Sequence, residues 1–156
     1  MNRQDVVVGT MARAEFDSFK ANSIACPMFL VPVTKNSDSS AYFNMVSQIQ
    51  DGKHCLLSSL EDFRQNPTGA SPLMVVTIYD ELVADKGIAL IRGDIINQLD
   101  ISKANAAGVL KHLRHFYSNQ FTLVKQFNKE PRSFDYSDFM QKHRQFQCSH
   151  SYGEAL

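Results

Sequence analysis

Residues 42–58 read YFNMVSQIQDGKHCLLS, and this stretch carries the strongest local signal of structure in the chain. Apolar side chains largely alternate with polar ones up to Gln50, as a strand with one buried face requires. Asp51 and Gly52 follow at once, and this pair favours a type I′ turn because both central residues of that turn have positive φ. Residues 54–58 then predict the returning strand. The stretch therefore predicts an antiparallel β-hairpin.

The segments on either side of the hairpin predict further strands and helices. Residues 28–33 predict an edge strand, because Pro32 cannot donate to a ladder of hydrogen bonds. Residues 73–79 are apolar on both faces and rich in β-branched side chains, which is typical of a central, fully covered strand. The expected elements are a helix over 10–21, strands over 28–33, 42–50 and 54–58, a short helix at 60–63, strands over 73–79 and 88–94, a helix after Ser102 that extends to Tyr117, a strand over 121–127 and a helix over 137–146.

Clustered strands with hairpin connections indicate an α+β fold, a mainly antiparallel β-sheet with helices packed against it. The length of 156 residues fits a single domain. We expect residues 1–23 to form an N-terminal extension that is partly helical, residues 24–146 to form the main domain, and residues 147–156 to form a polar tail.

Composition excludes several classes of partner. Lys plus Arg and Asp plus Glu number 16 each, so the chain has no strong field to hold nucleic acid or an anionic membrane. No apolar run approaches the roughly 20 residues that span a bilayer, and we expect no membrane insertion. The three cysteines, Cys26, Cys55 and Cys148, are odd in number and widely spaced, which indicates free thiols and not a disulfide framework.

Residues with catalytic or metal-binding potential are scattered. His54 and Cys55 are adjacent on a predicted strand, so their side chains point to opposite faces and cannot easily form a nucleophile and base pair. His112 and His115 lack a cysteine or carboxylate at ligand spacing, which favours a solvated helix face. His143 forms a loose C-terminal cluster with Cys148 and His150 that matches no tight metal motif. We expect no catalytic residue, no metal and no cofactor.

Four segments together resemble the assembly-factor-1 family of mitochondrial ATP synthase. Residues 85–91 read DKGIALI and residues 115–117 read HFY, and after them come LVKQFN at 123–128 and PRSFDY at 131–136. Further upstream, residues 26–32 and the YDEL sequence at 79–82 are similar to the first strands and a turn of that family. The similarity covers roughly residues 24–140 and rests on the order of these segments more than on any one of them.

The resemblance implies a non-enzymatic function. Such proteins are chaperones that bind the free beta subunit of the catalytic F1 sector and prevent its aggregation until the alpha subunit replaces them. It also implies the mitochondrial matrix, and we expect a monomer. Residues 1–10 are not rich in arginine or serine and include Asp5, unlike a mitochondrial presequence, so we expect either no targeting signal or a shortened form.

A contact surface is expected near the end of the last predicted strand. Phe127, Asn128, Pro131 and Phe134 are close in sequence, and a loop with two aromatic side chains and a proline is a good protein contact. Arg92 is a further candidate, at the rim of the contact. The alternative interpretation is structural, since aromatic side chains are often buried, and the two phenylalanines would then anchor the C-terminal helix.

Two other functions stay open on the sequence. A thiol-dependent hydrolase would use Cys55 or Cys148, and it would require a thiol of lowered pKa in a cleft beside a histidine. A generic protein-interaction module would keep the same fold and bind another partner.

Overall fold

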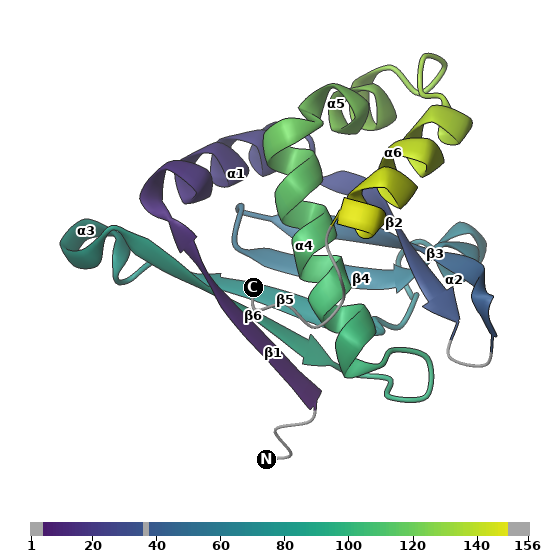
Figure 1. Cartoon of the computed structure of the whole chain (residues 1–156), viewed down its shortest axis with the longest axis horizontal. Coiled ribbons are helices and arrows are strands. Elements are labelled where there is room, and N and C mark those ends of the chain that lie inside the picture. The colour runs from purple at the N-terminus through teal and green to yellow at the C-terminus, as the bar shows by residue number, and fades with distance from the viewer. Residues whose placement is uncertain (1–4, 36–37, 150–156) are drawn as a thin grey trace.

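A six-stranded antiparallel sheet organises the molecule, with the strand order β1-β6-β5-β4-β3-β2 (Figure 1). The computed structural model describes residues 5–35 and 38–149. All neighbouring strands pair antiparallel, which confirms the α+β class predicted from the sequence. The strands are β1 (Val6–Ala12), β2 (Met28–Lys35), β3 (Asp38–Gln50), β4 (His54–Ser59), β5 (Met74–Tyr79) and β6 (Ile88–Ile95).

The hairpin predicted from residues 42–58 is present as β3 and β4. Gln50 pairs with His54, and Asp51 and Gly52 between them have φ values of 56° and 68°. These positive angles are those of the type I′ turn. A side chain at position 52 would also approach Lys20, because its Cβ would lie 2.7 Å from Lys20 Cγ. Glycine at position 52 therefore allows both the positive φ of the turn and the close approach of Lys20.

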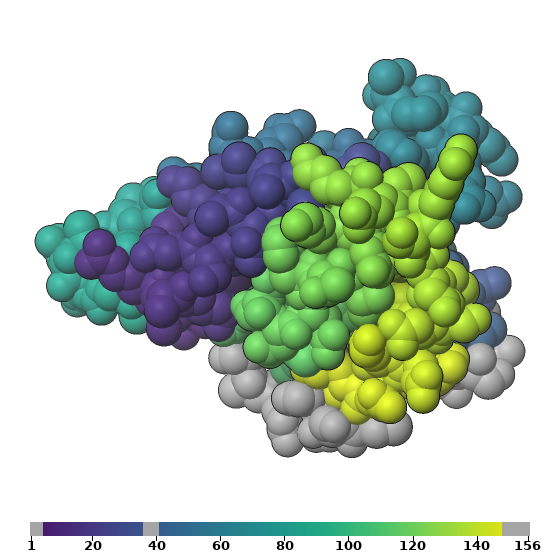
Figure 2. Space-filling view, turned by 90° about the horizontal axis from the view of Figure 1, so that it is seen from above, coloured from purple at the N-terminus to yellow at the C-terminus, as the bar shows by residue number. Residues whose placement is uncertain are grey.

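Four of the six helices form a layer on one face of the sheet. In Figure 1, α1, α4, α5 and α6 lie in front of the strands, and Figure 2 shows the purple, green and yellow helices on one side with blue and teal segments on the other. None of the helices described is both long and apolar enough to cross a bilayer. The helices are α1 (Arg13–Ala25), α2 (Leu60–Gln65), α3 (Val83–Lys86), α4 (Lys103–Asn119), α5 (Phe121–Lys129) and α6 (Tyr136–Ser149).

The longest helix, α4, is the centre of this layer and confirms its sequence prediction. Ser102 caps it: its hydroxyl accepts a hydrogen bond from the Asn105 N–H at 3.1 Å, and the Asn105 side chain accepts in return from the Ser102 N–H. Its apolar stripe is buried against the sheet. Arg114 at its outer side holds Glu15 of α1 with two hydrogen bonds of 2.7 and 2.9 Å, which fixes α1 on α4.

The strand predicted over residues 121–127 is wrong, because this segment is helix α5. Leu123, Val124 and Phe127 follow a spacing of one and three residues, which places them on one side of a helix. Leu123 and Val124 are buried there, against β2 and the core. The β-branched and aromatic side chains suggested a strand, but helical packing against an existing sheet overrides that weak preference.

The N-terminal prediction is wrong at its start. Residues 6–12 form β1, which pairs with β6 in a regular register from Val6 opposite Asp94 to Ala12 opposite Ile88. The helix begins at Arg13 and ends at Ala25, later than the predicted 10–21. The expected boundary at residue 24 falls inside α1, and β1 and α1 share the sheet and core of the remaining chain.

Two features of the central strands also differ from expectation. β5 is central as predicted, but only alternate residues are buried, so the expected cover on both faces is wrong. Gly93 lies within the regular register of β1, β6 and β5 and not at a bend. Glycine fits there because a Cβ would lie 2.5 Å from Met74 Cε and 3.0 Å from Val7 Cγ2. The edge position of β2 is confirmed. Of the expected polar tail, residues 147–149 belong to α6 and residues 150–156 lie outside the described residues.

Candidate interaction surfaces

The predicted contact residues Phe127, in α5, and Phe134, in the loop before α6, lie side by side. Their rings meet edge to face at 5.3 Å between centroids. Phe127 also packs edge-on against Phe29 at 5.9 Å, and Phe134 contacts Phe139 at 5.6 Å. Both side chains are half-buried against the core. These contacts are the ones that anchoring of the C-terminal helix requires, and their role in binding a partner stays a prediction.

Asn128 joins α5 to the start of β2. Its side-chain oxygen accepts a hydrogen bond from the Met28 N–H at 3.0 Å, and its amide donates to the carbonyl oxygens of Met28 and Val124. The side chain thus satisfies both backbone groups of one strand residue. Pro131, by contrast, is exposed in the turn that follows α5.

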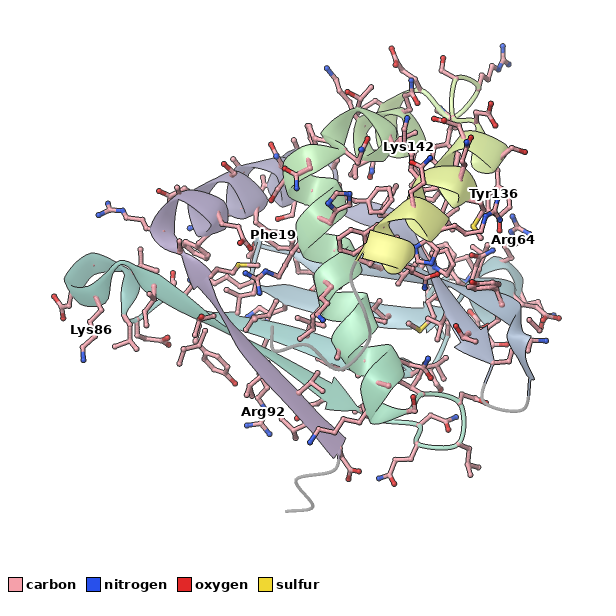
Figure 3. The ribbon with its side chains drawn as sticks, viewed as in Figure 1. Phe19, Arg64, Lys86, Arg92, Tyr136 and Lys142 are labelled. Atoms are coloured by element: carbon pink, nitrogen blue, oxygen red, sulfur yellow. The ribbon has the colours of Figure 1, made fainter. Side chains whose placement is uncertain are left out.

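Arg92 lies on a different surface from this loop. Its position in β6 is opposite Val8 of β1 on one side and Thr77 of β5 on the other. Its guanidinium contacts the Asp94 carboxylate at 3.0 Å. In Figure 3, Arg92 is at the opposite end of the molecule from Tyr136, which follows the loop. The structure brings Phe127, Asn128 and Phe134 together but does not bring Arg92 to them.

The sheet face that carries Arg92 is the second candidate surface, and the sequence prediction missed it. Val8 is 66% exposed, Tyr79 is 39% exposed, and Leu56 and Leu90 are each 38% exposed. Cross-strand pairing places Tyr79 beside Leu90. We call the following side chains the open-face patch: Val8, Leu56, Val75, Tyr79, Ile88 and Leu90.

A signal for this patch was present in the sequence. Residues 73–79 and 88–91 are apolar at successive positions, not alternate ones, so any strand made from them presents apolar side chains on both faces. The sequence prediction of a fully covered strand assigns this cover to the chain itself. On β5 and β6 the helix layer covers one face only, and the apolar residues of the other face are half-buried or exposed. Toward β3 and β2 the same face is covered, since Val46 and Leu30 are buried.

A pair of buried histidines lies beneath α6. His112 Nε2 donates to the Leu30 carbonyl oxygen at 2.9 Å, so its Nδ1 is the acceptor for His143 Nδ1–H at 3.1 Å. His143 Nε2 is buried, and no described group bonds to it. The expectation that His112 lies on a solvated face is wrong, because α4 turns it toward β2 and α6.

Burial determines the protonation of this pair. Removal from water lowers the pKa of His112 well below its ordinary value, and the adjacent His143 lowers it further. Burial also lowers the pKa of His143 to about 4, with a smaller effect from the nearby Arg144 charge. Both rings are therefore neutral at pH 7, and they hold α6 against α4 and β2 through uncharged hydrogen bonds.

The thiol chemistry considered from the sequence lacks an activated group at Cys55. This thiol is buried, and burial raises its pKa to about 12, so it is protonated at neutral pH. Cys26 is buried as well. Cys148 lies in α6, and His150 lies outside the described residues. Within residues 5–35 and 38–149, no group of three or more histidine, cysteine, aspartate or glutamate side chains is placed to hold a metal ion.

An α+β domain with an uncovered apolar sheet face, and with its Cys55 thiol inactive, has the features of a protein-binding domain. The chain matches the family model described as ATP11 protein over residues 1–140. It belongs to this family, the family of mitochondrial F1 ATP synthase assembly factor 1, as the resemblance implied. No curated protein gives a match.

Membership of the family gives the general role of the chain. The chain acts in the assembly of the F1-ATPase and interacts with F1 subunits. It belongs to a family of assembly chaperones and not to a known enzyme family, and the family is mitochondrial.

Proposed function

We propose that this chain is a molecular chaperone that binds the free beta subunit of F1 and prevents its aggregation before alpha and beta assemble. The observation that carries the proposal is the family match, which extends over residues 1–140. An unassembled subunit exposes interfaces that resemble a domain core cut in half, and such surfaces aggregate. A chaperone for them must cover apolar surface and later release it.

The surface chemistry of the domain supports this role. Apolar side chains of β1, β4, β5 and β6 are partly exposed without cover from the described helices. Equal numbers of basic and acidic residues leave no strong field for nucleic acid. The proposal further places the chain in the mitochondrial matrix, as a monomer. Phe127, Asn128, Pro131 and Phe134, with Arg92 at the rim, stay the predicted contacts.

An aggregation assay tests the proposal. Purified beta subunit is warmed alone and with the chain at a near-stoichiometric ratio, and light scattering is followed. We expect scattering to fall as the ratio approaches one to one, because each chaperone covers one subunit. An unrelated protein of similar size at the same mass is the control. If a chain that circular dichroism shows to be folded leaves scattering unchanged, the proposal is wrong.

The two alternatives predict other results. A thiol hydrolase that uses Cys55 is not favoured, because the Cys55 thiol is protonated at neutral pH. A generic interaction module would retain another protein from matrix extract in a pull-down, with the beta subunit absent from the bound fraction.

A further inference from the structure

The open-face patch is arranged in rows across the strands. Tyr79 is the direct partner of Leu90, and Leu56 is the direct partner of Val75. Between these two rows runs a more polar row, in which Val8 is followed by Arg92 and Thr77. Directly opposed side chains on one face lie about 4.5–5.5 Å apart at Cβ. The patch, together with Arg92 and Thr77 between its two rows, thus forms a continuous surface of mixed apolar and polar character.

This face departs from the usual pattern of a sheet with one solvated side. Antiparallel sheets with an open face normally alternate apolar residues inward with polar residues outward. Here β5 directs Met74, Val76 and Ile78 into the core, and yet Val75 and Tyr79 on the other side are also large and apolar or aromatic. Such composition is typical of a strand between two layers. The described chain supplies one layer, which indicates that a partner supplies the other.

The charges on this face indicate what kind of partner fits it. Arg92 and Asp94 are the charged side chains among the outward positions of these strands, and they pair with each other at 3.0 Å. At the rim, Lys53 pairs with Asp80 at 2.8 Å. Each positive charge has a negative neighbour, so the face has no net charge to complement. The cores of protein interfaces are likewise depleted in charge and enriched in aromatic side chains.

We propose that the open-face patch is the surface that docks on the free beta subunit, against an apolar and uncharged part of its subunit interface. This inference rests on the proposed function, and it assigns the contact to a surface other than the loop around Phe127 and Phe134. The bound beta subunit covers the open-face patch, in the position that a second layer would occupy on this face of the sheet. Arg92 then lies inside the contact, held by Asp94, and not at the rim of the loop.

A photo-crosslinking experiment distinguishes the two surfaces. p-Benzoylphenylalanine replaces Tyr79 in the patch in one variant and Tyr136 beside the loop in the other, and these tyrosines are similarly exposed at 39% and 47%. Each variant of the full chain is irradiated with free beta subunit. We expect crosslinks to the beta subunit from position 79, at several times the yield from position 136. An equal or greater yield from position 136 would overturn the inference.

A second experiment removes apolar area and retains the strands. The variant Val8→Thr, Leu56→Thr, Leu90→Thr places β-branched threonine, which suits strands, at all three positions. The control is Ile24→Thr, Leu99→Thr, which removes two exposed apolar side chains outside the patch. We expect the patch variant to bind the beta subunit at least about tenfold more weakly and the control to bind like the wild type. Equal affinity of the patch variant and wild type would overturn the inference.

The remaining outcomes are also decisive. If the wild-type chain suppresses aggregation and neither position crosslinks to the beta subunit, the inference is wrong and the proposed function stands. If position 79 crosslinks to a second copy of this chain and not to the beta subunit, the patch is a self-association surface and the inference is overturned. If the wild-type chain binds no beta subunit at all, both proposals are wrong.

Discussion

The two faces of the sheet differ in the environment of their large apolar side chains. On the covered face, Phe29 is fully buried and its ring contacts those of Phe116, Phe127 and Phe139 at 5.2–5.9 Å. On the open face, Tyr79 and Leu90 are neighbours that remain more than one third exposed. The comparison teaches that folding stability is concentrated on the covered face. The open face is the one that our inference assigns to recognition.

The largest expected effect comes from the centre of the covered face. We expect Phe29→Ala to lower the free energy of unfolding by about 3–5 kcal/mol, because it removes a ring from a closely packed cluster and leaves a cavity. Urea denaturation followed by circular dichroism measures the change. A loss below about 1 kcal/mol would mean that the cluster collapses around the gap and that the covered face is less tightly packed than its contacts indicate.

The buried histidine pair gives the covered face a pH dependence. At pH values about one unit or more above 6.5, both rings are neutral in the folded and unfolded chains, and they contribute almost no slope. Below that pH the unfolded chain binds protons that the folded chain does not, because burial lowers the pKa of His112 and takes that of His143 to about 4. The free energy of unfolding therefore falls as the pH drops from 6.5 toward 4.

The expected slope is up to about 1.4 kcal/mol per pH unit for each histidine. Urea titrations at several pH values between 7 and 4 measure it. The variant His143→Gln removes one of the two titrating rings, and we expect the slope in this range to fall by about half relative to wild type. A stability that is flat over this range in the wild-type chain would show that the rings are not held neutral.

Asn128, near the end of α5, tests whether a predicted contact residue acts in stability or in binding. We expect Asn128→Ala to lower the free energy of unfolding by about 1–3 kcal/mol, because both backbone groups of Met28 lose their partner. Lys125→Ala, at an exposed position of the same helix, is the control and should change stability by less than about 0.5 kcal/mol. If Asn128→Ala leaves stability unchanged but abolishes binding of the beta subunit, the predicted contact at Asn128 is correct.

The smallest effect is expected on the open face. Leu90→Thr should change the free energy of unfolding by less than about 1 kcal/mol, because the side chain is 38% exposed in the isolated chain and threonine suits a strand. Thermal denaturation beside wild type measures it. A loss near that of Phe29→Ala would show that both faces belong to the core, and the comparison between them would no longer hold.

The sequence predicted those elements whose signals are local. Asp51 and Gly52 determined the hairpin because few residues tolerate two successive positive φ angles. Ser102 and the apolar spacing up to Tyr117 determined α4, and Pro32 indicated an edge strand. The errors fell where local preference is weak. Residues 121–127 are β-prone in composition, but their packing against β2 makes them helical.

The candidate surfaces were less accessible to sequence reasoning than the fold. Phe127 and Phe134 were selected as neighbours in the sequence, and the structure shows them packed on each other and on the core. Val8 and Leu56 belong to strands far apart in the chain, and they share a face only because β6 and β5 lie between β1 and β4. His112 and His143 are likewise joined by tertiary packing alone.

By itself the sequence determined the class of fold, the hairpin, the main helix and membership of an assembly-factor family, because these depend on neighbouring residues and on their order. Only the tertiary structure decided which apolar residues are covered. Alternation assigns residues to one face or the other, but it does not say whether a helix layer lies over both. In this chain the main helix layer packs on one side of the sheet, and apolar residues of β1, β4, β5 and β6 on the other side stay partly exposed.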